Sequence, residues 1–239
     1  MLDIIHDNWL LLLIGTYPNG PLGGIAATLS LSVLGIGLAF PLSVLIALAQ
    51  LSPVGWIRRP AAWMRYLVRS IPLVMLIFIV YFLLPILIGR PLSGFTTMVC
   101  TLVIFEAMYL AEVVRAGMEA LPSGQAQAAA ALGLSYFDRM RYIILPQALY
   151  NMLPSMMGIF VTTIKDTSLG YVIGVQEVTY AANQVNNNLL TQPFQVFFLL
   201  SLVYFFICFS LTRTASYLER RIHRRRTVTE SPMPVSTVG

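Results

Sequence analysis

A lysine and an aspartate stand side by side at the end of an apolar stretch that covers about residues 147–164. Charged side chains within or beside a bilayer are costly, and by default they indicate a functional site. Lys165 and Asp166 could bind a small ligand that carries both a carboxylate and an ammonium group, through charge-assisted hydrogen bonds. Thr167 and Ser168 add hydroxyl groups to the same segment. The alternative is structural, with the two charges neutralising each other or other buried charges.

A second set of candidates lies earlier in the chain. Arg69 and Ser70 precede Pro72, and a proline leaves a backbone carbonyl of the preceding turn without its usual donor. Arg69 could satisfy that carbonyl, pair with an acid or meet a ligand carboxylate. Glu106 should lie near the middle of the bilayer, roughly 18 Å along its helix, and we expect it to pair with Arg69 or Lys165. The candidate ligand path therefore consists of two groups of residues. The first is the segment from Lys165 to Ser168, and the second is Arg69, Ser70, Pro72 and Glu106.

Several classes of protein can be excluded. The only lysine, Lys165, follows Ile164, so the chain lacks the Gly-Lys pair of a nucleotide-binding P-loop. Any ATP and magnesium would therefore be bound by a partner. His6 and His223 lie in terminal segments, which argues against a histidine-based catalytic triad or zinc site. We expect no catalytic residues, metal or cofactor in this chain.

The composition is that of an integral membrane protein. Of 239 residues, 57% are hydrophobic and only 10% are charged, whereas soluble domains carry about 25% charged residues. The mean hydropathy is +0.77. This length has room for one bundle of about five membrane spans with short loops, and for no separate soluble domain.

The apolar segments divide the chain into three parts. We expect an N-terminal interfacial segment over residues 1–21, a transmembrane domain over 22–218 and a basic, partly disordered tail over 219–239. The short apolar stretch 2–14 should form an interfacial helix, and it lacks the basic start of a cleaved signal peptide. The predicted spans cover about residues 22–48, 62–88, 95–114, 147–164 and 193–217. Within the third, Glu112 and Arg115 should form an intrahelical pair.

The arginines fix an expected orientation. Basic clusters lie at 56–65, 115–141 and 220–226, and five spans place all three on one side of the membrane. Positive loops remain cytoplasmic, so we expect the N-terminus outside and the C-terminus inside. The run at 220–226 would then meet anionic lipid headgroups, and its charge does not indicate nucleic-acid binding.

The loop between the third and fourth spans has an unusual pattern. An alanine-rich helical segment ends at Gly133, and Ser135 is placed to cap a second helix. Ile143 and Leu145 return the chain to the membrane, where Pro146 opens the next helix. An ordinary polar loop is the alternative interpretation. Small side chains allow another surface to approach the helix closely, which favours a docking site for a cytoplasmic partner.

The spacing of this loop resembles the EAA loop of ABC importer permeases. Gln127-Ala128-Ala129, Gly133 and Ile143-x-Leu145-Pro146 match the pattern, except that Gln127 replaces the usual glutamate. In that family the helix fits a cleft on the ATPase subunit and transmits its motion to the membrane. The resemblance implies coupling of an ATPase through Gly124, Gln127, Ala128, Ala129, Leu132, Gly133, Ile143, Leu145 and Pro146, within a loop of about residues 123–146.

Further motifs resemble the polar amino acid permeases, the histidine/glutamine/glutamate group of ABC importers. They are VRSIPLVM (68–75), EAMYLAEVVRAGMEALPSGQ (106–125), LPQAL (145–149) and IKDTSL (164–169). The similarity covers roughly residues 20–225. It implies an all-α, type I importer permease fold in a bacterial inner membrane. It also implies a second permease subunit, two ATPase subunits and an external solute-binding protein.

The first of these motifs is closest to the glutamate/aspartate members, and Lys165 and Arg69 would suit an acidic amino acid. Three alternatives remain from the sequence. They are a secondary transporter driven by an ion gradient, a membrane-embedded enzyme and a non-transporting scaffold subunit. Inverted repeats and matched broken helices, the usual signs of a secondary transporter, are not found.

Overall fold

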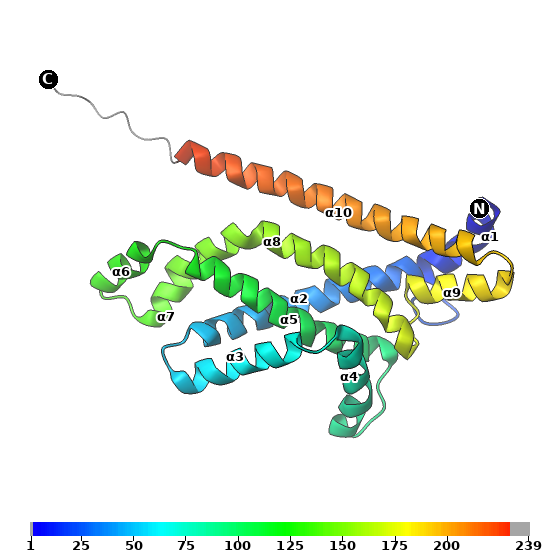
Figure 1. Ribbon diagram of the computed structural model, residues 1–239, viewed down its shortest axis with the longest axis horizontal. Helices are drawn as coiled ribbons and strands as arrows, with labels where there is room; N and C mark the ends of the chain where they lie inside the picture. Colours follow the sequence, from blue (N-terminus) through cyan, green and yellow to red (C-terminus); the bar gives the residue numbers. More distant parts are fainter. Residues whose placement is uncertain (1, 230–239) are drawn as a thin grey trace.

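Four long helices form the body of the molecule, in a computed structural model that describes the backbone of residues 2–229 (Figure 1). α5 packs against α2 and α8, and α8 packs in turn against α10. The four helices are α2 (Gly24–Leu51), α5 (Gly94–Glu119), α8 (Leu145–Asp166) and α10 (Pro193–Thr229). The predicted all-α fold is confirmed, and the predicted positions of these spans agree with the helices to within a few residues, apart from the longer ends of α5 and α10.

The remaining elements are shorter and connect or flank these four. They are α1 (Leu2–Ile14), α3 (Gly55–Arg69), α4 (Leu73–Ile88), α6 (Ser123–Ala131), α7 (Tyr136–Asp138), the π-helix η1 (Arg139–Ile144), the 3-10 helix η2 (Thr167–Ile173) and α9 (Val178–Leu189).

Small residues bring the long helices close together. A Cβ atom on Gly35 of α2 would lie 3.1 Å from the Cβ of Leu102 of α5. A Cβ on Gly117 of α5 would lie 2.9 Å from the Sδ of Met152 of α8. Transmembrane helices associate mainly by such packing, because lipid is as apolar as their side chains. α5 therefore forms the centre of the bundle.

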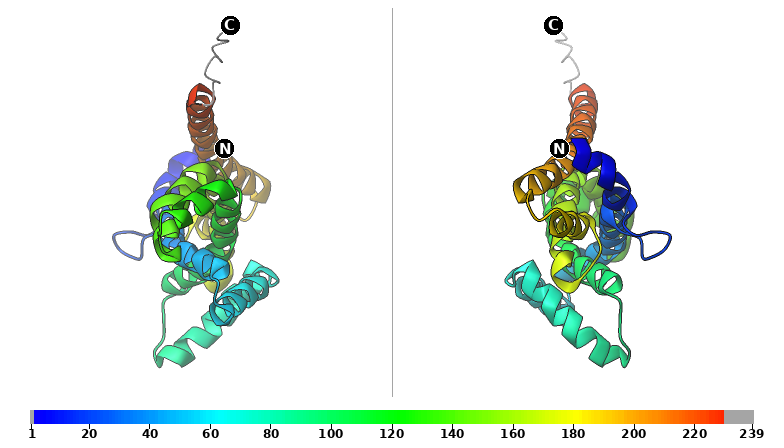
Figure 2. Two further views of the ribbon diagram at one scale, coloured as in Figure 1. Left: turned by 90° about the vertical axis from the view of Figure 1, so that its left-hand side faces the viewer. Right: turned by 90° about the vertical axis from the view of Figure 1, so that its right-hand side faces the viewer.

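The predicted second span is not one helix, which corrects the interpretation of residues 62–88. α3 ends at Arg69, α4 begins at Leu73, and the two helices are bent by 108°. Pro72 explains the break, because proline has no N–H for the helical ladder and disfavours a helical conformation in the residue before it. Figure 2 shows α3 and α4 projecting from one side of the bundle.

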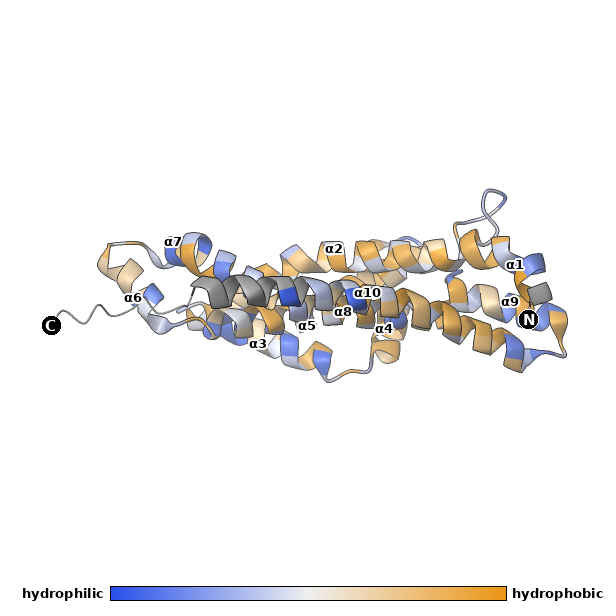
Figure 3. Ribbon diagram, turned by 90° about the horizontal axis from the view of Figure 1, so that it is seen from above, coloured by the Kyte–Doolittle hydropathy of each residue, from blue (hydrophilic) through white to orange (hydrophobic). Residues whose placement is uncertain are grey.

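Four helices are long and apolar enough to cross a bilayer, or five spans if α3 and α4 form one broken span. This agrees with the prediction of about five. Figure 3 shows hydrophobic residues along the long helices, with hydrophilic residues at α7 near one end and at α1 and α9 near the other. The length of the bundle therefore corresponds to the direction across the membrane.

The end of the molecule that holds α1 and α9 has a small core of its own. Ile4 and Leu12 of α1 pack with Ala181, Ala182 and Val185 of α9. The helix α1 is predicted correctly, but α9 falls within the stretch 165–192, for which the sequence predicts only mixed structure. Its three successive asparagines disfavour a helix, and packing against α1 and α10 outweighs that preference.

The last helix is longer than its span. α10 continues to Thr229, so the first part of the predicted tail over 219–239 is helical. The disorder predicted after Thr227 falls on the last two residues of this helix and on residues 230–239, which lie outside the described residues.

Candidate functional site

The alanine-rich loop forms a compact helical unit at one end of the molecule, opposite α1 and α9 (Figure 1). α6 ends in a Schellman motif, in which the N–H of Leu134 bonds to the carbonyl of Ala129 at 3.2 Å and the N–H of Gly133 to that of Ala130 at 3.0 Å. Gly133 has a φ of +80°, a left-handed conformation that L side chains rarely adopt. The predicted stop at Gly133 is confirmed.

The second half of the loop is fixed to the bundle. The Ser135 hydroxyl accepts a 3.2 Å bond from the N–H of Asp138, which confirms the predicted cap of α7. The Tyr136 hydroxyl donates to the Leu51 carbonyl at the end of α2, at 2.7 Å. Arg139 reaches back to the carbonyl of Ala126 in α6, at 3.4 Å. α6 is therefore connected to the spans by specific contacts.

A π-helical turn joins this unit to the fourth span. η1 leads directly into α8, where Pro146 occupies the first turn as predicted. The 22 residues of α8 cover about 33 Å at 1.5 Å per residue. One helix therefore connects the loop directly with Lys165 and Asp166.

The exposed face of α6 and α7 combines small residues with two large apolar side chains. Gly124, Gln127 and Ala128 are exposed, whereas Ala129 is buried. Leu132 is 83% exposed and Phe137 is 63% exposed. Such large exposed apolar side chains at the polar end of a membrane protein indicate a contact surface. Phe137 is absent from the candidates that the sequence gives, because the resemblance is carried by other positions.

The candidate ligand path is brought together only in part. Lys165 is exposed, Asp166 and Ser168 are partly exposed, and Thr167 is buried. Glu106 is 3% exposed, and the Thr163 side chain of α8 lies beside its carboxyl group. The Asp166 side chain lies near the same carboxyl group. Glu106, Thr163 and Asp166 therefore form one polar group where α5 crosses α8.

The expected pairing of Glu106 with Arg69 or Lys165 is wrong. Among the described residues neither cation forms an ion pair with it, and its Oε1 atom is buried without a hydrogen-bond partner. Arg69 instead lies over the ring of Tyr109, 4.8 Å from its centre. Tyr109 is one helical turn beyond Glu106, so Arg69 is near this region without meeting the acid.

The break after Arg69 defines the positions of Ser70 and Pro72. The Ser70 hydroxyl donates to the Tyr66 carbonyl at 2.7 Å, one turn earlier in α3. Pro72 is the N-cap of α4. These two residues therefore form the bend between α3 and α4, and they leave Arg69 at the end of α3, with a guanidinium that contacts α5.

A charged network joins α3 to α5. The predicted pair of Glu112 and Arg115 is confirmed, with an Nη2 to Oε1 distance of 2.7 Å. Glu112 also pairs with Arg65 of α3, which is buried, and Arg115 pairs with Glu119 at 2.6 Å. The sequence groups Arg65 with the basic cluster at 56–65, which it assigns to a loop, whereas the structure places Arg65 within α3.

Comparison with known proteins assigns the family. The model of the binding-protein-dependent transport system inner membrane component matches residues 39–224. The chain is 32% identical to the inner membrane amino-acid ABC transporter permease protein YhdY of Escherichia coli strain K12, over 86% of this chain. It covers 57% of that relative, which is little more than half its length.

Two further similarities cover most of both chains. The glutamate/aspartate import permease protein GltK of Escherichia coli O6:H1 is 32% identical, over 84% of this chain and 92% of that protein. A crystal structure of an amino acid ABC transporter with histidines superposes with a TM-score of 0.75 at 29% identity. That superposition covers 83% of this chain and 92% of the other.

Proposed function

This chain belongs to the family of binding-protein-dependent transport system inner membrane components, and we propose that it is the permease subunit of an ATP-driven importer of polar amino acids. The observation that carries the proposal is the α6–α7 unit, which presents a small, apolar surface at one end and is fixed to the spans. The named function of the relatives supports the same conclusion.

The coupling would run through one continuous path. ATPase subunits that bind α6 would move it, and η1 would pass the motion to α8. α8 ends at Lys165 and Asp166, so motion of the ATPases would reach the ligand path without a separate transmission element. The spans would then alternate between states open to the outside and to the cytoplasm.

Gly133→Asp tests this coupling. A side chain at a φ of +80° strains the end of α6, so the docking surface should be misplaced while the spans still insert. We expect the assembled transporter to lose substrate-stimulated ATP hydrolysis. Gly37→Ala is the matched control, because Gly37 lies within α2 with open space around its Cβ position. Unchanged uptake in Gly133→Asp would refute the docking role.

The substrate is proposed to be an amino acid, with glutamate or aspartate favoured. Lys165 and Arg69 supply positive charge for carboxylates, and Asp166 and Glu106 supply negative charge for the ammonium group that every amino acid carries. The sequence VRSIPLVM and the 32% identity to the glutamate/aspartate permease support the acidic members.

Lys165→Ala tests the ligand path. Because Lys165 is exposed at the end of α8, its removal should leave assembly intact and should impair uptake. Competition by unlabelled glutamate, aspartate, glutamine and histidine in the wild-type transporter would identify the substrate. Normal uptake and normal substrate-stimulated ATP hydrolysis in Lys165→Ala would remove Lys165 from the mechanism.

The assembly follows from the same proposal. The chain would form a dimer with itself or with a sister permease and would bind two cytoplasmic ATPase subunits. An external solute-binding protein would deliver the substrate at the end that holds α1 and α9. The C-terminal end of α10 and the α6–α7 unit would lie in the cytoplasm.

A further inference from the structure

Glu177 is a buried acid that lies outside every candidate site considered so far. Its side chain is 0% exposed, in the short connection between η2 and α9. A carboxylate removed from water is costly unless its oxygens accept hydrogen bonds. The contacts that satisfy Glu177 therefore show which parts of the molecule depend on it.

Both oxygens of Glu177 are used. Oε1 accepts from the N–H of Tyr180 at 3.0 Å, and Oε2 accepts from the N–H of Thr179 at 2.8 Å. These bonds make Glu177 the N-cap of α9 and satisfy two donors of its first turn. Oε2 also accepts from the hydroxyl of Tyr204 in α10, at 3.1 Å. One carboxylate thus connects α9 to the last span.

The same connection is held on α2. The N–H of Val178 donates to the Thr28 hydroxyl at 3.2 Å, and the N–H of Gly24 donates to the Gln176 carbonyl at 2.9 Å. The approach is close, since a Cβ atom on Gly23 would lie 2.8 Å from the Gln176 carbonyl oxygen. The backbone around Glu177 is therefore fixed between α2 and α10.

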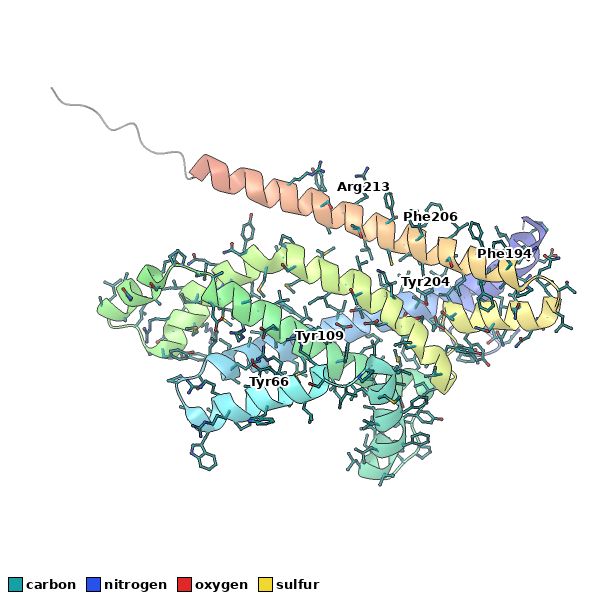
Figure 4. The ribbon with its side chains drawn as sticks, in the orientation of Figure 1. Tyr66, Tyr109, Phe194, Tyr204, Phe206 and Arg213 are labelled. Atoms are coloured by element: carbon teal, nitrogen blue, oxygen red, sulfur yellow. The ribbon has the colours of Figure 1, made fainter. Side chains whose placement is uncertain are left out.

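Tyr204 connects this cluster to the ligand path. Its hydroxyl lies 3.1 Å from the Thr179 hydroxyl, and the Thr167 side chain lies beside it. Figure 4 shows Tyr204 on the side of α10 that faces the bundle, whereas Phe206 and Arg213 point away from it. Thr167 follows Lys165 and Asp166 directly, at the start of η2. Hydrogen bonds thus join Glu177 to Tyr204, and Tyr204 lies next to Thr167 in the candidate ligand path.

We propose that Glu177 is a positioning residue for transport, which holds α9 against α10 and, through Tyr204, sets the position of the segment after Lys165. The inference rests on the proposed function, because it assumes that this segment contacts the substrate. With the contact intact, movement of α8 carries η2, α9 and α10 together. Without it, ATP-driven movement of α8 is no longer transmitted to the end of the bundle that receives substrate.

The experiment uses the complete transporter, reconstituted with its ATPase subunits and solute-binding protein. Uptake and ATP hydrolysis are measured together in the wild type, Glu177→Gln, Tyr204→Phe and the double variant. We expect the number of ATP molecules hydrolysed per imported molecule to rise, because losing one hydrogen bond to a charged group shifts the equilibrium away from the coupled arrangement by about tenfold. Because both residues act through one contact, the double variant should be no worse than Glu177→Gln alone.

The matched control is Tyr180→Phe, which removes a neighbouring hydroxyl but keeps the backbone N–H that caps α9. Tyr180→Phe should hydrolyse as many ATP molecules per imported molecule as the wild type. A purely structural role would lower the amount of assembled transporter and reduce uptake and hydrolysis in proportion, leaving that ratio unchanged. Such a result would overturn the inference.

If Glu177→Gln does not assemble, the same ratio measured in Tyr204→Phe tests the inference, because that variant loses only one hydroxyl group. Failure of the wild type to import with ATP would instead refute the proposed function.

Discussion

At the scale of single residues, the pair of Glu112 and Arg65 joins a buried cation to a neighbouring helix. The Arg65 side chain is buried, and its guanidinium meets a carboxylate on the neighbouring helix. Taking the carboxylate away would leave that cation buried without its partner, a change that costs more than the pair itself contributes. The contact therefore holds α3 to α5 on the side of the bend from which α4 departs.

Glu112→Gln should destabilise the protein by about 2 to 3 kcal/mol, less than for a fully buried pair because Glu112 keeps part of its side chain exposed. The measurement is the melting temperature of the purified protein in detergent, which should fall by several degrees. Glu119→Gln is the control, since its half-exposed carboxylate pairs with Arg115 and, among the described residues, with no other cation. Equal effects of the two changes would show that the pair with Arg65 is not the important contact.

At the scale of elements, the α6–α7 unit combines a fixed interior with an exposed apolar face. Ser135, Tyr136 and Arg139 hold its interior, and Leu132 and Phe137 form the face. Residues that hold the unit and residues that contact a partner are thus separate. Changes on the face should therefore affect binding of the ATPase without affecting the fold of the loop.

Replacing both Leu132 and Phe137 with serine tests this separation. The double variant should insert and melt like the wild type, because these side chains are mostly exposed, but it should co-purify with much less ATPase. Leu190→Ser is the control, since Leu190 is 81% exposed at the opposite end of the molecule. Normal recovery of ATPase with the double variant would place the docking surface elsewhere.

Local sequence patterns predicted some elements well and others poorly. The long apolar runs, Gly133, Ser135 and Pro146 act through local chemistry, so α2, α5, α8 and the loop boundaries could be predicted. The bend at Pro72 was missed because the apolar residues on both sides of Arg69, Ser70 and Pro72 were interpreted as one span. The helix α9 was missed because its stability comes from packing against α1 and α10.

The candidate ligand path shows the same limit. The segment from Lys165 to Ser168 could be identified because charge in an apolar context is conspicuous. The neighbours of Glu106 could not be identified, since they depend on which face of α5 meets α8. Glu177 was missed because a lone acid in a polar stretch has no distinctive sequence signal. Its burial appears only when α2, α9 and α10 come together.

At the scale of the whole molecule, the account requires opposite ends on opposite sides of the membrane. Cysteines introduced at Asn187 and Ser123, in a background with Cys100 and Cys208 replaced by alanine, test this. A membrane-impermeant maleimide should label Asn187→Cys in intact cells, because α9 would face outward. It should label Ser123→Cys only after the membrane is opened. The reverse pattern would invert the orientation and place the docking loop outside the cell.

The central claim is that a partner's ATP hydrolysis moves substrate through this chain. Its most direct test is uptake of radiolabelled amino acids into vesicles that hold the complete transporter, with and without ATP on the ATPase side. We predict uptake that requires ATP and continues when an uncoupler abolishes ion gradients. Uptake that continues without ATP and collapses with the uncoupler would contradict the account and identify a secondary transporter.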